Sequence, residues 1–198
     1  MSSPFSDPGQ RREAGVLGMW VFLVTEALFL GALVVAYGIS RWIHPDEFAR
    51  ASGLLDWKAG TANTVLLLSS GFTMALAVRD VHFDRPRRTV PLLALTAALG
   101  TAFLAVKGVE YYEKWAEGHV PWLFADEPVT RLWLLYYFGL TGLHAAHVLA
   151  GVAALAALIL RTSIRRPATV EITGLYWHFV DVVWIFLFPL LYLLGRHR

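Results

Sequence analysis

The chain has 198 residues, of which 57% are hydrophobic, 14% aromatic and 16% charged. A soluble domain has about 25% charged residues, and the mean hydropathy of +0.53 also argues against a disordered chain or an ordinary soluble enzyme. Cysteine is absent, which excludes disulfides, thiolate zinc sites and cysteine-held iron–sulfur clusters. The net charge of +2, without a dense basic cluster, gives no reason to expect nucleic acid as a partner.

Five long apolar segments follow one another, at about residues 14–40, 59–79, 89–113, 130–160 and 171–195. Each approaches or exceeds the roughly 20 residues that a helix needs to cross a membrane. Only helices and closed barrels can span lipid, and these segments do not alternate as strands do. The sequence predicts an all-α membrane protein, with residues 1–198 forming one transmembrane domain, a five-helix bundle. Its longest loop, residues 41–58, contains Pro45.

Five spans place the two termini on opposite sides of the membrane. The segments on the N-terminal side carry nine basic residues, against seven on the other side. Because cytoplasmic loops are enriched in Lys and Arg, we expect a cytoplasmic N-terminus and an external C-terminus. Aromatic residues near the ends of the spans are expected to form an interfacial belt. They are Trp42, Trp57, Trp115, Trp122, Trp133, Tyr136, Tyr137 and Tyr192.

Glu26 lies near the middle of the first predicted helix. A charge at the bilayer centre costs about 2.5–3.5 kcal/mol or more, so we expect a neutral acid unless a partner is present. Two interpretations stay open: a hydrogen-bonded structural acid, or a group that handles protons. Met19, Phe22, Leu33 and Tyr37 share its helix face, which we expect to pack inside the protein.

The fourth predicted helix carries His144 and His147, three residues apart and therefore on one face. No second pair of ligands is expected at the same depth, so hydrogen bonding to a buried carboxyl group or a lipid is favoured over metal or haem binding. A stripe of small residues on roughly the opposite face predicts a close contact with another helix. The stripe consists of Gly139, Gly142, Ala146 and Ala150.

The fifth predicted helix carries Glu171, His178 and Asp181 on neighbouring faces. We expect a structural polar clamp in which His178, three residues before Asp181, is the partner of that carboxyl group. Lys107 and Glu110 have the same spacing and predict an ion pair near the external interface.

Arg161 ends the fourth predicted helix, where it is either a positive-inside anchor or a contact for a lipid phosphate. An intramembrane serine protease is excluded because Leu68 replaces the glycine of its motif, and no phosphate-binding loop, HExxH motif or nucleophile elbow is present. No catalytic or metal-binding residue is therefore predicted.

Five motifs, one in each predicted helix, carry a resemblance to a known family. They read VFLVTEALFLGAL, NTVLLLSSG, VEYYEKW, GLTGLHAAHVLAG and YWHFVDVVWIFLF. Together and in this order they resemble subunit III of the haem–copper oxidases, of the cytochrome c oxidase type. The resemblance touches all five helices, and WHFVDVVW is its most specific part. It implies the shorter, five-helix bacterial form, without the two N-terminal helices that line a lipid-filled cleft in the longer form.

The resemblance implies a subunit of the bacterial inner membrane that binds no haem or copper itself. Those centres are expected in subunits I and II, with cytochrome c as the electron donor, while subunit III supports proton uptake, stability and phospholipid binding. By motif, Glu26 resembles the family's buried carboxyl and His147 the histidine near it, so the resemblance implies a proton-related role for both. Arg161 resembles an arginine that meets a lipid head group.

The remaining motif residues are assigned to structure and assembly. They are His144, Glu171, Trp177, His178 and Asp181. Three alternatives stay open: a quinol oxidase subunit, an accessory protein of nitric oxide reductase, and a free-standing proton-coupled transporter. The transporter is disfavoured because the sequence lacks the internal repeat common in that class.

Overall fold

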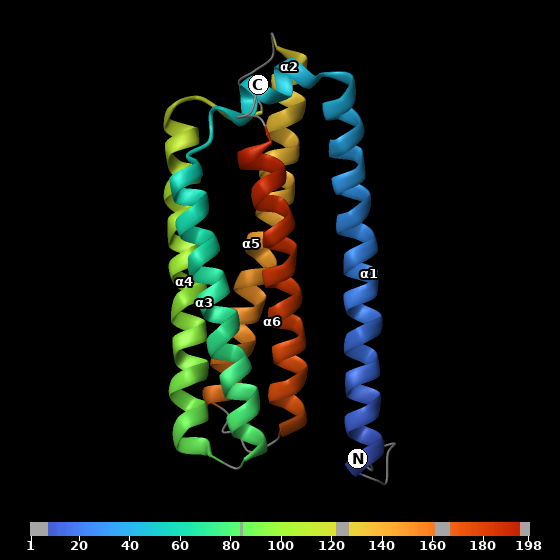
Figure 1. Ribbon diagram of the computed structural model, residues 1–198, viewed down its shortest axis with the longest axis vertical. Helices are drawn as coiled ribbons and strands as arrows, with labels where there is room; N and C mark the ends of the chain where they lie inside the picture. The colour runs from blue at the N-terminus through green and yellow to red at the C-terminus, as the bar shows by residue number, and fades with distance from the viewer. Residues whose placement is uncertain (1–7, 84, 122–126, 161–166, 195–198) are drawn as a thin grey trace.

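The computed structural model describes residues 8–83, 85–121, 127–160 and 167–194. These residues form helices and connecting turns, without a strand, as Figure 1 shows. The elements are α1 (Pro8–Ile43), α2 (Pro45–Ser52), α3 (Trp57–His82), α4 (Pro86–Ala116), α5 (Pro128–Leu160), α6 (Pro167–Phe188) and the π-helix η2 (Pro189–Leu193). Five spans are long and apolar enough to cross a membrane, α6 and η2 together making the fifth. The prediction of five apolar spans is confirmed.

Four of the helices form a closed bundle, and the first lies beside it. α3 packs against α4 and α6, and α5 packs against the same two helices. α1 lies along α6 and α5 and is the least buried span, as its separate position in Figure 1 shows. The start of α1 and the end of η2 lie at opposite ends of the bundle, called here the amino end and the carboxyl end.

Proline and capping residues set the limits of several helices. α2, α4 and η2 have proline in their first turn, where its missing N–H and fixed φ angle suit a helix start. The Asp56 side chain caps α3 by accepting a hydrogen bond of 2.8 Å from the Lys58 amide. Pro189 cannot donate to the preceding turn, and there α6 widens into η2, which ends with an i+5 bond from the Leu194 amide to the Pro189 carbonyl.

The predicted loop at residues 41–58 is wrong in one respect, because it contains α2. This short helix lies across the carboxyl end of the bundle (Figure 1) and buries Phe48, Ala51 and Ser52. Ser52 Oγ donates a hydrogen bond of 2.5 Å to the Leu191 carbonyl. A polar loop prediction missed α2 because its apolar face consists of only a few residues.

The aromatic residues near the helix ends do not all form a belt. Trp42, Trp57 and Trp115 are exposed, but Trp133, Tyr137 and Tyr192 are completely buried. The position of a residue along its helix indicates its depth in the membrane. Whether its ring is buried in the protein depends instead on which face of the helix meets the neighbouring helices. Trp122 lies outside the described residues.

Most of the small-residue stripe of α5 faces away from the other described helices, contrary to the prediction, although a Cβ on Gly142 would lie 3.6 Å from Tyr111 Oη of α4. Gly139, Ala146 and Ala150 are exposed, and nothing lies within 4 Å of a Cβ placed on Gly139. α5 instead turns its larger residues inward, because burying them removes more apolar surface from solvent.

Candidate functional site

The most informative contact in the membrane-spanning region joins α1 to α5. Nε2 of His147 lies 3.2 Å from Oε2 of Glu26, and the two side chains are 16% and 23% exposed. The second ring nitrogen of His147, Nδ1, lies 2.9 Å from the Leu143 carbonyl, and Tyr176 Oη donates to the His147 carbonyl at 2.9 Å. The structure therefore brings together the two residues for which the sequence suggested a proton-related role.

The Leu143 carbonyl fixes how this pair can hold protons. A carbonyl only accepts hydrogen bonds, so the Nδ1 atom of His147 carries a hydrogen. The Nε2 atom then meets either the O–H of a neutral Glu26 or, as an imidazolium N–H, the Glu26 carboxylate. In both states one exchangeable proton lies between the two side chains, and general acid–base groups use this arrangement.

The Glu26 face of α1 is only partly packed inside the chain, which corrects the prediction for that face. Tyr37 is fully buried, but Phe22 is 40% exposed. Phe22 contacts the ring of Tyr176 at a centroid distance of 6.3 Å. α1 lies outside the four-helix bundle, so its neighbours cover only part of its circumference.

His144 lies apart from the Glu26–His147 contact. It is 1% exposed and lies between the edge-on ring of Phe103, at 5.4 Å, and the stacked ring of Trp184, at 5.2 Å. Neither ring nitrogen has a hydrogen-bond partner among the described residues. Of the two histidines, His147 therefore has the expected carboxyl partner, which is Glu26. His144 has no such partner among the described residues and packs as an aromatic ring.

Glu171 links three helices at the amino end of the bundle. Its carboxylate accepts hydrogen bonds from Arg12 of α1, at 2.9 and 3.1 Å, and lies 2.6 Å from His82 Nε2 of α3. His178, on the same helix as Glu171, does not take part in this cluster. The cluster ties the start of α1 to the bundle.

Trp177 fills the centre of the bundle. It is 1% exposed, and its indole nitrogen donates to Ser70 Oγ of α3 at 3.0 Å. Its ring occupies the space that glycines leave free on two helices. A Cβ would lie 2.6 Å from the ring at Gly100 of α4 and 2.8 Å from it at Gly151 of α5.

The predicted pairing of Asp181 with His178 is wrong within the described residues. Asp181 is 6% exposed, and its Oδ1 has no hydrogen-bond partner there. Its carboxyl group lies against α3 instead, where a Cβ on Gly71 would be 2.5 Å from Oδ2. An i,i+3 spacing brings two side chains near each other, but the rotamers that packing selects decide whether they bond.

Lys107 and Glu110 form the predicted ion pair, at 3.2 Å, and both are 3% exposed. The pair has two further partners that the sequence did not indicate. Tyr137 of α5 and Tyr192 of η2 each donate to Glu110 Oε1 at 2.6 Å. The two tyrosine hydroxyl oxygens also accept hydrogen bonds from Lys107 Nζ, Tyr137 at 3.1 Å and Tyr192 at 2.8 Å. Every donor of the ammonium group is thereby satisfied.

Two further charged residues continue this row of α4 toward the carboxyl end. Lys114 donates to Glu117 at 2.6 Å, and Glu117 also lies 3.0 Å from His119. These hydrogen bonds, that of Lys114 first, hold the pKa of Glu117 below its usual value. The spacing of Lys107, Glu110, Lys114 and Glu117 places these four residues on one helix face.

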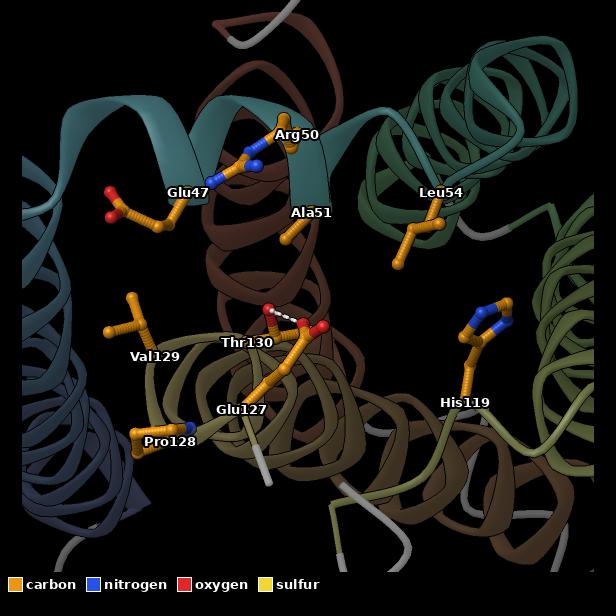
Figure 2. Close-up of a pocket in the computed structure, with 9 residues that line it drawn as sticks. All are labelled: Glu47, Arg50, Ala51, Leu54, His119, Glu127, Pro128, Val129 and Thr130. Atoms are coloured by element: carbon orange, nitrogen blue, oxygen red, sulfur yellow. Dashed lines mark hydrogen bonds between the residues drawn. The ribbon is translucent and has the colours of Figure 1, made fainter. Parts of the chain in front are cut away.

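A pocket of about 460 Å³ opens near this row, between α2 and the start of α5. Figure 2 shows Glu47 and Arg50 on one side, Glu127 and Thr130 on the other, and His119 beside them. Thr130 donates to Glu127 at 3.0 Å. The pocket contains no residue of the Glu26–His147 contact.

Within the described ranges, no group of three or more His, Asp or Glu side chains is arranged to hold a metal ion. Arg161, the predicted lipid contact, lies outside those ranges. The arrangement is therefore a membrane-spanning helix bundle with a carboxyl–imidazole contact and a buried ion pair.

The class of this bundle is established by comparison with known families. The chain belongs to the cytochrome c oxidase subunit III family, whose family model matches residues 11–196. This is the family of subunit III of the haem–copper oxidases, and it does not carry the redox centres of those complexes. The resemblance seen in the five helix motifs is confirmed, and the five spans and the family together indicate a membrane-embedded protein.

Individual relatives come from both oxidase types. The chain is 33% identical to cytochrome c oxidase subunit 3 of Thermostichus vulcanus, over 91% of this chain and 88% of that protein. It is 28% identical to quinol oxidase subunit 3 of Bacillus subtilis, over 98% and 94%. It is also 33% identical to haem–copper oxidase subunit I+III of Aeropyrum pernix, over 88% of this chain but 22% of that longer protein.

Proposed function

We propose that this chain is the non-redox subunit III of a respiratory haem–copper terminal oxidase in a bacterial cell membrane. Oxygen reduction takes place in its partner subunits, and this chain supports proton uptake and the stability of the complex. The amino end of the bundle faces the cytoplasm, because the sequence places the larger share of basic residues at that end. Family membership supports the complex, and the Glu26–His147 contact supports the proton-related role.

The contact between Glu26 and His147 carries this proposal. It joins a carboxyl group at the midpoint of α1 to an imidazole of α5 at 3.2 Å. Titratable side chains inside the membrane are costly and commonly mark proton paths. Because both groups keep some exposure, the proton they share can exchange with water or with polar groups of a partner subunit that covers α1.

Subunit I is the proposed direct partner, and subunit II completes the complex. The Aeropyrum pernix relative, named as subunit I+III, supports a complex in which subunits I and III lie together. The exposed face of α1 carries large apolar side chains, among them Trp20, Val24 and Leu28, which need such a partner or lipid acyl chains. Arg161 is the proposed contact for a phospholipid head group.

Cytochrome c is the proposed electron donor to the complex, and quinol is the alternative. The Thermostichus vulcanus relative favours the first and the Bacillus subtilis relative the second. Copper in the subunit II that accompanies this chain would establish the cytochrome c type. A subunit II without copper would establish the quinol type.

The substitution Glu26→Gln tests the proton-related role, because glutamine keeps the shape of the side chain but cannot release a proton. We expect the complex to assemble with its haems and to show altered proton uptake, or faster inactivation, during turnover in vesicles. Glu113→Gln is the matched control, since Glu113 is an exposed carboxyl near the carboxyl end of α4. Unchanged proton uptake and unchanged inactivation in the assembled Glu26→Gln complex would contradict the proposed role.

A further inference from the structure

A second intramembrane carboxyl group, on α6, lies apart from the Glu26–His147 contact. Asp181 is at the midpoint of the span Pro167–Leu193 and is 6% exposed. Its Oδ1 has no hydrogen-bond partner among the described residues. An ionised carboxylate buried without a cation or a donor carries a large desolvation penalty, whereas the neutral acid carries a much smaller one. The surroundings therefore favour Asp181 with a bound proton.

A glycine on the neighbouring helix makes room for this carboxyl group. A Cβ on Gly71 of α3 would lie 2.5 Å from Asp181 Oδ2 and 3.7 Å from His178 Nδ1. The carboxyl oxygen and the imidazole nitrogen thus border the same point on the α3 backbone. Although they form no hydrogen bond in this structure, a small movement or one water molecule would connect them.

A cavity leads from the amino end of the bundle to His178. It has a volume of about 420 Å³ and lies where α1, α3 and α6 meet. Among the residues that line it are Arg12, Val16, Ala75, Val78, Glu171 and His178. Its polar residues include the Arg12–Glu171 ion pair at the surface and the His178 imidazole farther along α6, so the entrance can hold water.

The spacing along α6 continues this path inward. Glu171, His178 and Asp181 lie within about 80° of one another around the helix, and ten residues correspond to about 15 Å along its axis. Asp181 is one turn beyond His178, which is exposed and lines the cavity. The three side chains therefore lead from the amino-end surface to the middle of the span.

The other charged groups along this path are already paired. At the amino end, Arg12 and His82 contact Glu171, and Arg79 contacts Asp80. The elements packed around Asp181 present Gly71 from α3, while the ring of Trp177 separates α6 from Gly100 of α4 and Gly151 of α5. His178 is thus the titratable group of the described residues that borders Asp181.

We propose that Asp181 is a proton-binding site reached from the aqueous phase at the amino end, with His178 as its relay. His178 takes a hydrated proton from the cavity at one ring nitrogen, which leaves a neutral water molecule behind, and passes a proton to a carboxylate oxygen of Asp181. The step moves one proton and needs no oxidant, reductant or other co-reactant. It goes beyond the proposed role of Glu26 and His147, because it uses a different helix, a different cavity and a different carboxyl group.

Infrared difference spectroscopy of the complex that contains the full chain tests this proposal. The wild type minus Asp181→Asn spectrum is expected to show the C=O stretch of a protonated carboxyl group, shifted to lower frequency in D₂O. His178→Phe is expected to slow the deuterium shift of that band. His147→Phe is the matched control, because it removes another imidazole of the membrane-spanning region but leaves the path along α6 unchanged.

Three results would overturn the proposal. If the Asp181→Asn variant lacks a carboxylate band of the wild type, and not a carboxylic acid band, Asp181 is ionised. An acid band that does not exchange in D₂O, or one whose exchange is unaffected by His178→Phe, would exclude the path from the amino end. A failure of Glu26→Gln to alter proton uptake would contradict the proposed function without changing this band.

A second variant keeps the test decisive if Asp181→Asn does not assemble. Gly71→Ala places a methyl group against Oδ2 of Asp181 while leaving the carboxyl group present. Its spectrum is expected to show the acid band shifted in frequency. An unshifted band in Gly71→Ala would assign that band to another carboxyl group and overturn the proposal.

Discussion

Nε2 of His147 on α5 lies 3.2 Å from Oε2 of Glu26 on α1, and this contact lies between two other attachments of α1. Near its start, Arg12 binds Glu171 of α6. Near its end, Arg41 donates to the Leu194 carbonyl at 2.7 Å. α1 is thus attached at both ends and at its midpoint, although it remains outside the four-helix bundle. A change at the midpoint can therefore alter proton exchange without detaching the helix.

Glu26 and His147 are expected to act as one unit. Residues in direct contact have non-additive effects, so the double variant Glu26→Gln/His147→Gln should change proton uptake about as much as the stronger single variant. Parallel measurements of proton uptake by the three assembled complexes in vesicles provide the test. Independent, additive effects of the two substitutions would show that the 3.2 Å contact has no functional meaning.

The buried pair Lys107–Glu110 should stabilise the chain only when both charges are present or both are absent. Lys107→Met leaves Glu110 buried without its cation, and breaking a buried pair in this way costs about 3–5 kcal/mol. The double variant Lys107→Met/Glu110→Gln should recover much of this loss, because no unpaired charge remains. Thermal unfolding of the purified complexes, with the loss of this subunit as the readout, measures the difference in stability between the single and the double variant. A double variant no more stable than Lys107→Met would contradict the explanation.

Tyr192 should contribute to stability through its hydroxyl group. Tyr192→Phe removes a bond to Glu110 and one to Lys107, and hydrogen bonds to charged groups contribute about 1.5–3 kcal/mol. Tyr112→Phe is the matched control, because Tyr112 is 66% exposed on α4. We expect lower thermal stability for Tyr192→Phe and little change for Tyr112→Phe. Equal stability of the two variants would show that η2 is not held by this cluster.

The fit of Trp177 against α4 should make Gly100 intolerant of even a methyl group. A Cβ there would lie 2.6 Å from the indole ring, and overpacking a core costs about 1–3 kcal/mol. On the same helix, Gly108 has nothing within 4 Å of a Cβ, so Gly108→Ala should be neutral or stabilise the helix by up to about 1 kcal/mol. Unfolding curves for Gly100→Ala and Gly108→Ala should therefore shift in opposite directions or differ clearly. Equal curves would mean that Trp177 can move aside.

The five spans could be predicted from the sequence because apolar length is a local property, and the Lys107–Glu110 pair because both residues lie on one helix. The partners from other helices could not. Tyr137 and Tyr192 reach Glu110 through the tertiary packing of α5 and η2, which no spacing within α4 encodes. For the same reason the spacing of His178 and Asp181 gave a wrong prediction of their pairing, since the carboxyl group of Asp181 lies against Gly71 of α3.

The contact between Glu26 and His147 is an intermediate case. Intramembrane position marked both residues as candidates, but only the family resemblance placed the histidine near the acid. The tautomer of His147 became clear with the Leu143 carbonyl 2.9 Å from Nδ1. The small residues of α5 show the opposite outcome: small size permits a close helix contact, but nothing in the described chain lies within 4 Å of a Cβ placed on Gly139.

The most direct test of the central claim, that this chain works within a haem–copper oxidase, is mild purification of the tagged protein from its native membranes. A reduced-minus-oxidised visible spectrum and the masses of all co-purified subunits are then recorded. We predict haem bands together with a large many-helix subunit I and a subunit II, whose copper content identifies the electron donor. A colourless chain that is folded, monodisperse and without partner subunits would contradict the account.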